Sequence, residues 1–301
     1  MIKDSELLKL IMERYPEQPF DFILEQFTIF KAGLIEANGK LAERDMVEDI
    51  AESAKIETTQ DAVSETETDM LPAPRKKYTR RNLVAKPEEA IGKTKRTDYP
   101  ILTGKDVMIQ AEYKGFRGQA FTDAPSSFEG MLEDILQMDI EHDPHDRGIF
   151  IATVNAVMAS LGLCCGTVHC RTEGPELCAQ DMLNYLEINY PDVKRIALVG
   201  FQPSLLEMLS KSKYDVRVMD LNPNNIGQLK FGIRVEDGTA MKEEIRDSYA
   251  ELILCTGSTL CNGSIIDYLD LDKDVLFFGT TASGAAPLLG LKRVCFADKY
   301  E

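Results

Sequence analysis

The chain has 301 residues, of which 34 are Lys or Arg and 50 are Asp or Glu, so its formal net charge is −16; hydrophobic residues make up 44%. This length allows one large or two small domains with a buried core, and the net acidity disfavours indiscriminate binding to nucleic acid. No apolar run approaches the roughly 18 residues of a membrane span, and the first ten residues lack the uninterrupted apolar stretch of a signal peptide. We therefore expect a cytoplasmic protein whose seven cysteines are thiols or metal ligands rather than a disulfide framework.

The first third of the chain predicts helices followed by a linker. Residues 1–56 repeat apolar residues at spacings of three and four, which predicts a helical N-terminal segment that packs on the main body, on a partner or on another copy in a homo-oligomer. Residues 57–99 lack this periodicity and predict a flexible linker with a basic cluster at Arg75–Arg81. This cluster offers contacts to nucleic acid, but we favour a solvated tether beside an acidic body.

Residues 100–145 predict a small α+β lead domain. The segments DVMIQAEY and FRGQAFTDA flank Lys114-Gly115, a pattern typical of a hairpin with a tight glycine-containing turn. Ser126 and Ser127 then offer a hydroxyl cap for a following short helix.

Residues 146–301 predict an α/β domain. The segment GIFIATVNAVMASLGL is apolar nearly all round, which predicts a buried helix that ends at Gly162. Short apolar runs then alternate with helical or loop segments, which predicts a doubly wound, mostly parallel sheet. We place its strands at residues 195–200, 215–220, 251–255, 274–279 and 293–296. Such sheets bind ligands beyond the carboxyl ends of their strands, so the residues after each strand are the candidates for function.

The first two strand ends argue against classical binding of NAD. Gly200 follows the first strand, but the glycine-rich dinucleotide pattern is missing, and Pro203 has no N–H to donate to a phosphate. Asp220 ends the second strand, where a carboxylate is placed to hold a ribose hydroxyl pair or an amine. Capping of the following Asn222-Pro223 turn explains Asp220 equally well.

Two later strand ends carry hydroxyl-rich loops. The third strand leads into TGSTLCNGS, which spans residues 256–264, and the fourth leads into GTTASG, which spans residues 279–284. These loops predict a binding cleft for a polar ligand, because hydroxyls, an amide and glycines gather at neighbouring strand ends. The candidate ligand-binding residues of the two loops are Thr256, Gly257, Ser258, Thr259, Asn262, Gly263, Thr280 and Thr281.

The segment between residues 163 and 178 concentrates four of the seven cysteines and one of the three histidines. Thiolate and imidazole are ligands for soft transition metals, so His169, Cys170 and Cys178 are the candidate metal ligands. Pro175 predicts the start of a helix, whose dipole would lower the pKa of the Cys178 thiol. The alternative is that the cysteines are small apolar core residues, the interpretation that we favour for Cys164, Cys255 and Cys295.

These motifs resemble the putative heavy-metal chelation domain family. The resemblance covers about Gly148 to Phe296 and is carried by TVNAVMA, GTVHCRTEGPELCA, ALVGFQPSLLEML, DLNPNNIG, TGSTLCNGS and GTTASGAAPLLGL. It implies a Rossmann-like C-terminal domain over residues 146–301, a lead domain similar to the amino-terminal part of enolase, and a ligand cleft between them. It also implies that Asn155, Gly200, Pro203 and Asp220 belong to the ligand-binding residues, with Asn155 and Asp220 contacting the ligand from elements that face the two loops. Gln202, Cys261 and the Gly279-Thr280-Thr281 turn depart from the family's pattern.

Three functional hypotheses follow. The first is a protein that binds a metal ion, a metal complex or a small anionic cofactor, with a transition metal as the cofactor that the cysteines suggest. The second is a transferase that uses a nucleotide or an S-adenosylmethionine-like cofactor. The third is a ligand-sensing regulatory or interaction module that uses the N-terminal helices and the basic cluster. No catalytic triad, paired carboxylate motif or P-loop is present in the sequence, so whether the protein is an enzyme stays open.

Overall fold

The structure of the protein is a computed structural model. It describes residues 83–84, 91–94, 96–103, 107–130, 132–135, 137–140 and 142–301. The predicted helical segment 1–56 and the basic cluster Arg75–Arg81 lie outside the described residues. Within the described residues, no helix combines the length and the hydrophobicity needed to cross a membrane.

A small antiparallel sheet opens the described part of the chain. Its strands are β1 (Leu83–Val84), β2 (Val107–Tyr113) and β3 (Phe116–Thr122), in that spatial order. The predicted hairpin is confirmed, because β2 pairs with β3 across a two-residue turn. Lys114 and Gly115 both have positive φ angles, of 48° and 81°, as the tight turns that match the strand twist require.

The second sheet has six strands and is mostly parallel. Its spatial order is β6-β7-β5-β4-β8-β9, and β6 alone runs antiparallel to its neighbour. The strands are β4 (Arg195–Val199), β5 (Asp215–Asp220), β6 (Leu229–Lys230), β7 (Ile233–Asp237), β8 (Leu252–Thr256) and β9 (Val275–Phe278). The mixed α/β fold and four of the predicted strands are thus confirmed. The strand predicted at residues 293–296 is wrong, because only Arg293 pairs there, in an isolated bridge to Phe277.

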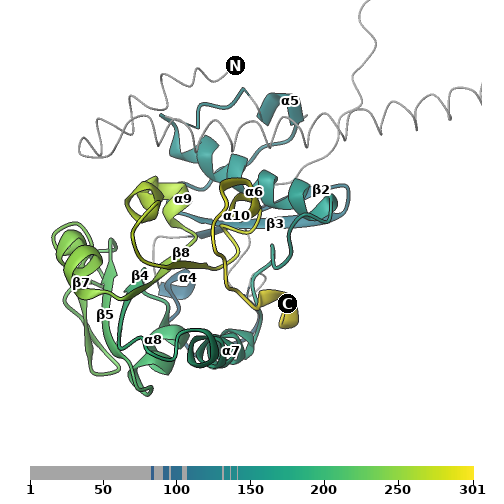
Figure 1. The fold of residues 1–301 in the computed structure, drawn as a ribbon. Coiled ribbons are helices and arrows are strands. Elements are labelled where there is room, and N and C mark those ends of the chain that lie inside the picture. Colours follow the sequence, from purple (N-terminus) through teal and green to yellow (C-terminus); the bar gives the residue numbers. More distant parts are fainter. Residues whose placement is uncertain are drawn as a thin grey trace, which may run out of the picture.

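Two hydrophobic clusters cover the two faces of this sheet. Alternate residues of each buried strand point to opposite faces: in β4, Ile196 and Leu198 belong to one cluster and Ala197 and Val199 to the other. The first of these clusters packs against α7 (Gly174–Asn189) and α8 (Pro203–Ser210), and the second packs against α6 (Pro144–Ser160) and the small sheet. Figure 1 shows these two layers on either side of the large sheet.

The predicted buried helix is α6. Asp143 caps its start by accepting a hydrogen bond from the backbone N–H of His145 at 2.8 Å, and Pro144 occupies its first turn. Eleven consecutive residues, from Gly148 to Met158, are buried, because the helix lies between the small sheet and the rest of the molecule. The domain boundary predicted between residues 145 and 146 therefore falls inside a continuous helix.

The remaining helical elements are short. They are α4 (Pro100–Thr103), α5 (Leu132–Ile135), the π-helical η2 (Glu244–Tyr249), α9 (Thr259–Asn262), α10 (Ala285–Leu289), and the 3₁₀ turns η3 (Ser264–Tyr268) and η4 (Ala297–Lys299). Part of the range predicted as a flexible linker, residues 57–99, has a defined place in the fold. It contributes β1 and the buried side chains of Ile91 and Tyr99, which form a small cluster with Ile101 and Met108. Ile91 and Tyr99 are too few to show a period in the sequence, but tertiary packing buries both.

Candidate functional site

The candidate site lies where the direction of the sheet reverses. From β4 the chain passes through α8 to the neighbouring strand β5, and it later returns to the other side of β4 as β8. The turns after β4 and β8 therefore leave the sheet in different directions and open a crevice at the carboxyl ends of the strands. The turns meet closely here, since a Cβ on Gly200 would lie 2.5 Å from Cγ2 of Thr256.

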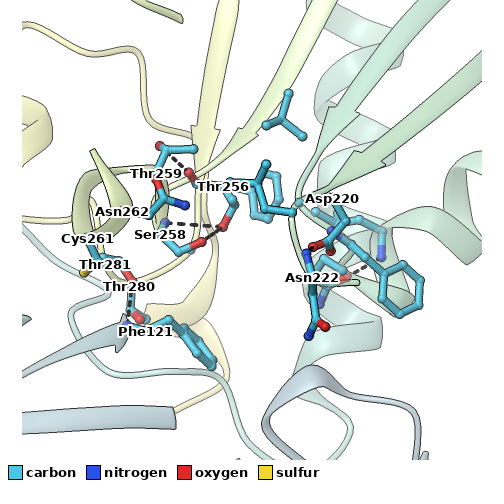
Figure 2. Close-up of a pocket in the computed structure, with 18 of the residues that line it drawn as sticks. Phe121, Asp220, Asn222, Thr256, Ser258, Thr259, Cys261, Asn262, Thr280 and Thr281 are labelled. Atoms are coloured by element: carbon cyan, nitrogen blue, oxygen red, sulfur yellow. Dashed lines mark hydrogen bonds between the residues drawn. The ribbon is translucent and has the colours of Figure 1, made fainter. Parts of the chain in front are cut away.

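A cavity of about 640 Å³ occupies this crevice. The predicted site residues that line it are Gly200, Asp220, Thr256, Ser258, Thr259, Asn262, Thr280 and Thr281, together with His169, Cys170 and Cys178. Figure 2 shows the hydroxyl-rich loops on one side of the cavity and Asp220 with Asn222 on the other. The two loops therefore open into one cavity, as their neighbouring strands predict.

The loop after β8 uses most of its polar atoms to hold its own shape. The Thr256 and Ser258 hydroxyls lie 2.9 Å apart, and the Thr259 hydroxyl donates to the Thr256 carbonyl at 2.7 Å. Asn262 Oδ1 accepts from both the backbone N–H and the hydroxyl of Ser264, at 2.9 and 2.6 Å. A ligand in the cavity thus meets a preformed polar wall, which costs little ordering on binding.

The loop after β9 leaves one hydroxyl without a partner. Thr281 Oγ1 accepts from the backbone N–H of Phe121 at 3.0 Å, which joins this loop to β3. Thr280 is 1% exposed and lines the cavity, and its Oγ1 has no hydrogen-bond partner among the described residues. Because burying an unpaired hydroxyl costs about 1–3 kcal/mol, this atom marks a place where a ligand or an ordered water would complete the hydrogen bonding.

The Asn155 side chain fixes the position of the loop after β9. Its side chain is fully buried in α6 and does not line the cavity. Its Nδ2 donates to the carbonyls of Gln119, Thr280 and Thr281 at 2.9, 3.1 and 3.1 Å, and its Oδ1 accepts from the Gly284 N–H at 2.6 Å. The expectation that Asn155 contacts the ligand is therefore replaced by a supporting role, since its amide is already committed to backbone groups.

The Asp220 carboxylate also accepts its hydrogen bonds from groups within the protein. Its Oδ2 accepts from the Phe201 N–H at 2.8 Å and from Asn225 Nδ2 at 3.2 Å, and its Oδ1 accepts from the Asn222 N–H at 2.7 Å. These bonds tie the turn after β4 to the turn after β5. The carboxylate borders the cavity, but most of its accepting capacity is used within the protein.

Three further predicted residues support the cavity from outside its lining. Pro203 is buried at the start of α8, where the preceding Gln202 caps the helix by accepting from the Leu205 N–H at 2.6 Å. Gly257 lies against the loop after β9, since a Cβ there would meet the backbone nitrogen of Ala282 at 2.7 Å. Gly263, with a φ of 79°, joins α9 to η3. None of the three lines the cavity.

The charges at the cavity are mainly acidic. Three aspartates line it, namely Asp123, Asp220 and Asp267. Asp267 is 2% exposed and accepts from Lys242 Nζ at 3.0 Å, so its charge is compensated within the wall. The other two carboxylates leave the cavity with a negative bias that favours ligands carrying positive charge or hydrogen-bond donors.

The predicted metal ligands line the cavity but do not converge. The His169 ring donates from Nδ1 to the Cys170 carbonyl at 2.6 Å, and Cys170 Sγ lies 3.7 Å from the same nitrogen. Across the part of the chain that the structure describes, no group of three or more His, Cys, Asp or Glu side chains is arranged to hold a metal ion. His169, Cys170 and Cys178 are therefore neighbours on one wall rather than a closed coordination site.

The pKa of Cys178 shifts opposite to the predicted direction. Pro175 lies in the first turn of α7, as predicted, and Cys178 follows one turn later. However, hydrogen bonding to the Cys170 thiol is the main cause that raises the pKa of Cys178, to about 11, against a lowering contribution from Cys295. The helix dipole is weak beyond the first turn, so contacts with other thiols outweigh it. Cys178 is not a reactive thiolate near neutral pH.

The half-buried His169 ring predicts a pH-dependent stability. Burial lowers the pKa of His169 below its ordinary value near 6.5, so the unfolded chain binds a proton that the folded chain excludes. The stability from the neutral ring is therefore present above that ordinary value and is lost as the pH falls below it. We expect His169→Asn, which keeps an N–H donor, to lose less free energy of unfolding between about pH 7 and pH 5 than the wild type does. Urea titrations at several pH values would measure this, and parallel pH profiles would contradict it.

Sequence reasoning missed several cavity residues. Tyr99 lies between the starts of two helices, where its hydroxyl donates to Glu176 Oε1 and lies 2.8 Å from Ser204 Oγ. Ile91, Phe121 and Cys295 also line the cavity. Their contacts join distant parts of the chain, and a lone apolar or thiol residue carries no sequence signal for such a contact.

Comparisons with known proteins agree with the motif resemblance over part of the chain. Residues 184–292 match the sequence model of the DUF364 family, described as putative heavy-metal chelation. A solved DUF364 protein of unknown function from Pyrococcus horikoshii has 18% identity and a TM-score of 0.40, and the match covers 59% of this chain and 69% of that chain. One from Desulfitobacterium hafniense DCB-2, also of unknown function, has 11% identity and a TM-score of 0.41, with 62% and 70% covered. A search of curated proteins gave no match.

Proposed function

We propose that this protein binds a small organic molecule, or a metal ion already held in an organic complex, in the cavity at the carboxyl ends of β4, β5, β8 and β9. In this proposal, the large sheet and its covering helices form a Rossmann-like, doubly wound domain. The small sheet and α5 form the lead domain, which closes one side of the cleft. The observation that carries it is the buried, unpartnered Thr280 hydroxyl in the wall of the cavity.

The size of the cavity supports an organic ligand. A volume of about 640 Å³ lies within the range of roughly 300–1,000 Å³ that is typical of sites for organic ligands, and far exceeds what a bare ion fills. The walls combine apolar side chains such as Phe121, Phe201 and Leu205 with the polar turns described above. Such a mixture suits a ligand with an apolar body and a few hydrogen-bonding groups.

The charge and the donor set support a metal complex over a bare metal ion. The family that matches residues 184–292 is described by heavy-metal chelation. Transition metals in proteins ordinarily take three or more protein donors, and the described residues offer no such group. If a metal enters this cavity, we propose that an organic chelator supplies most of its ligands, while Asp123 and Asp220 favour a complex with positive charge.

Nucleotide or S-adenosylmethionine binding has less support. In that hypothesis Asp220 holds the ribose hydroxyls at the end of the second strand. Its two oxygens already accept three hydrogen bonds from Phe201, Asn222 and Asn225, so a ribose would have to compete with them. We therefore keep the organic ligand or metal complex as the proposal.

Thr280→Val tests the ligand role of the unpartnered hydroxyl. The change removes a buried unpaired group while keeping the shape, so the free energy of unfolding should stay equal or rise by up to about 2 kcal/mol. Ligand occupancy should fall about 10-fold, the loss expected for one hydrogen bond of about 1.4 kcal/mol. Thr153→Val is the matched control, because Thr153 has the same buried, unpartnered Oγ1 in α6 but does not line the cavity.

The measurement has two stages. Small molecules extracted from cells are separated by chromatography, and each fraction is added to the full chain in thermal unfolding; a ligand at 100 times its dissociation constant stabilises by about 2.7 kcal/mol. Native mass spectrometry of the stabilised sample then gives the mass of the bound species in wild type and both variants. Equal occupancy in wild type and Thr280→Val, or stabilisation by bare metal salts alone, would contradict the proposal.

A further inference from the structure

Three segments that are distant in the sequence meet at one corner of the cavity, which we call the acceptor corner. It consists of Phe121 in β3 and Asp123 just after it, His169 before α7, and Thr280 after β9, and all four line the cavity. The Phe121 N–H donates to Thr281 Oγ1 at 3.0 Å, and the Phe121 ring meets the His169 ring edge-on, with the ring centroids 5.8 Å apart. Figure 2 shows Phe121 beside the turn that contains Thr280 and Thr281. Phe121 therefore joins the segments that form this corner.

The His169 ring contributes a hydrogen-bond acceptor to this corner. Its Nδ1 lies 2.6 Å from the Cys170 carbonyl oxygen, which can only accept, so Nδ1 carries the ring hydrogen. Burial lowers the pKa of His169, so the ring is neutral near pH 7. In a neutral imidazole with its hydrogen on Nδ1, Nε2 is an acceptor. No hydrogen bond from the described residues reaches Nε2, which leaves it available to a molecule in the cavity.

Asp123 and Thr280 add two further polar groups that other described residues leave unpartnered. The Asp123 carboxylate is exposed, and no described residue forms an ion pair or a hydrogen bond with it. The Thr280 hydroxyl is the buried, unpartnered group described above. A carboxylate and Nε2 of this neutral imidazole only accept hydrogen bonds, and a hydroxyl also accepts them. The corner therefore suits a ligand group that donates hydrogen bonds.

The charge of the cavity restricts this ligand group further. Among the described residues that line it, three are aspartates and one, Lys242, is a lysine, which leaves a net charge of −2. A primary ammonium group brings three N–H donors and a positive charge, whereas a hydroxyl brings one donor and no charge. An aromatic ring such as that of Phe121 also attracts a cation within about 6 Å of its centroid. Hydrogen bonding, charge and the aromatic ring thus favour the same group, an ammonium.

We propose that the cavity binds an organic amine in its protonated form, with the ammonium group held by the acceptor corner. This inference rests on the proposed function and names the chemical class of its ligand. The apolar side chains of the wall, such as Phe201 and Leu205, contact the hydrocarbon part of the amine. No covalent bond forms or breaks, so binding is reversible, and it weakens as salt screens the charges.

Three probes of similar shape test the charged group. They are 2-phenylethylamine, 2-phenylethanol and 3-phenylpropionate, which end in an ammonium, a hydroxyl and a carboxylate. Saturation-transfer NMR with the full chain at pH 7 measures their dissociation constants. We expect the amine to bind at least about 10-fold more tightly than the alcohol, because hydrogen bonds to charged groups are the stronger ones, and the carboxylate to bind most weakly. Raising the salt concentration from about 0.05 to about 0.5 M should weaken binding of the amine and leave binding of the alcohol unchanged.

Asp123→Asn tests the carboxylate of the acceptor corner. It should weaken binding of 2-phenylethylamine about 10-fold and leave binding of 2-phenylethanol unchanged, since only the amine gains from the charge. Asp192→Asn is the matched control, because Asp192 is also exposed but does not line the cavity, and it should bind the amine as wild type does. Thermal unfolding without probes confirms that both variants are folded.

Three results would overturn the inference. They are an alcohol or carboxylate that binds as tightly as the amine, no binding by any of the three probes, and equal binding of the amine by Asp123→Asn and Asp192→Asn. The cell-extract experiment keeps this inference apart from the proposed function. A stabilising compound that is neutral or anionic would contradict the amine and leave the proposed function standing, whereas extracts without any stabilising compound would contradict the proposed function itself.

Discussion

Replacing Asn155 by Asp is expected to lower the free energy of unfolding by about 3–5 kcal/mol. The amide of Asn155 donates to three backbone carbonyls and accepts one N–H, all within a site that is fully buried. A carboxylate has the same shape but donates nothing, so the carbonyls of Gln119, Thr280 and Thr281 would face a buried negative charge. Because two of these carbonyls belong to the loop after β9, we also expect occupancy of the cavity ligand to fall.

A surface substitution of the same type provides the control. Asn189 is exposed at the end of α7, where its Nδ2 donates to the Tyr185 carbonyl at 2.8 Å. Asn189→Asp should therefore change the stability by about 0.5 kcal/mol or less. Chemical denaturation of both variants at neutral pH makes the comparison. The supporting role of Asn155 would be contradicted if the two variants were equally stable, or if the stability of Asn155→Asp did not recover at acidic pH relative to the wild type, where the carboxyl is neutral.

Gly200→Ala has the second large expected effect, a loss of about 2–5 kcal/mol. Gly200 follows β4 with a φ of 85°, and in this left-handed region a side chain costs about 1–2 kcal/mol. In addition, the new Cβ would lie 2.5 Å from Cγ2 of Thr256, and such crowding typically costs about 1–3 kcal/mol more. Thr256 would have to move, and its hydroxyl contact with Ser258 at the cavity wall would be disturbed.

Gly279 separates the two contributions. It follows β9 with nearly the same φ, 89°, but a Cβ there meets nothing within 4 Å. Gly279→Ala should therefore lose only the backbone cost of about 1–2 kcal/mol. In a Thr256→Ser background, which lacks Cγ2 but keeps the Cβ at 3.1 Å, Gly200→Ala should cost less than in the wild type, though more than Gly279→Ala costs. Urea denaturation of the four variants of this double-mutant cycle measures the free energies of unfolding. Equal losses for Gly200→Ala in both backgrounds would rule out a steric clash between the new Cβ and Cγ2 of Thr256.

The sequence carries clear signals for the elements that are buried on both faces. The strands β4, β8 and β9 are short, largely apolar runs, and α6 is apolar nearly all round, because each lies between two packed layers. Where burial is partial, the signal disappears. Strand β7, next to the edge strand β6, mixes Arg, Glu and Asp with two apolar residues, and its alternation is too short to mark a strand in the sequence. Residues 293–296 show the reverse error, since an apolar run there packs without joining the ladder beyond Arg293.

The candidate site was predictable in its position but not in the roles of its residues. Parallel strands place their carboxyl ends at one edge, so Thr259 and Thr281 could be expected to share a cavity. The role of Asn155 depends on carbonyls that lie 36, 125 and 126 residues away in the sequence. The same is true of Cys295, which resembles a small core residue in the sequence but lines the cavity in the folded protein. Local patterns cannot reveal contacts of this range.

The alternation of side chains along β4 determines where the turn at the cavity begins. Ala197 faces the layer that contains α6, whereas Ile196 and Leu198 face the layer that contains α7 and α8. Sliding β4 by one position, about 3.3 Å, would drive isoleucine and leucine into space shaped for alanine and leave holes on the opposite side. The unequal sizes of these side chains thus fix the register of β4 in the sheet. The starting point of the turn at Gly200 is accordingly set by the packing of residues that never touch the ligand.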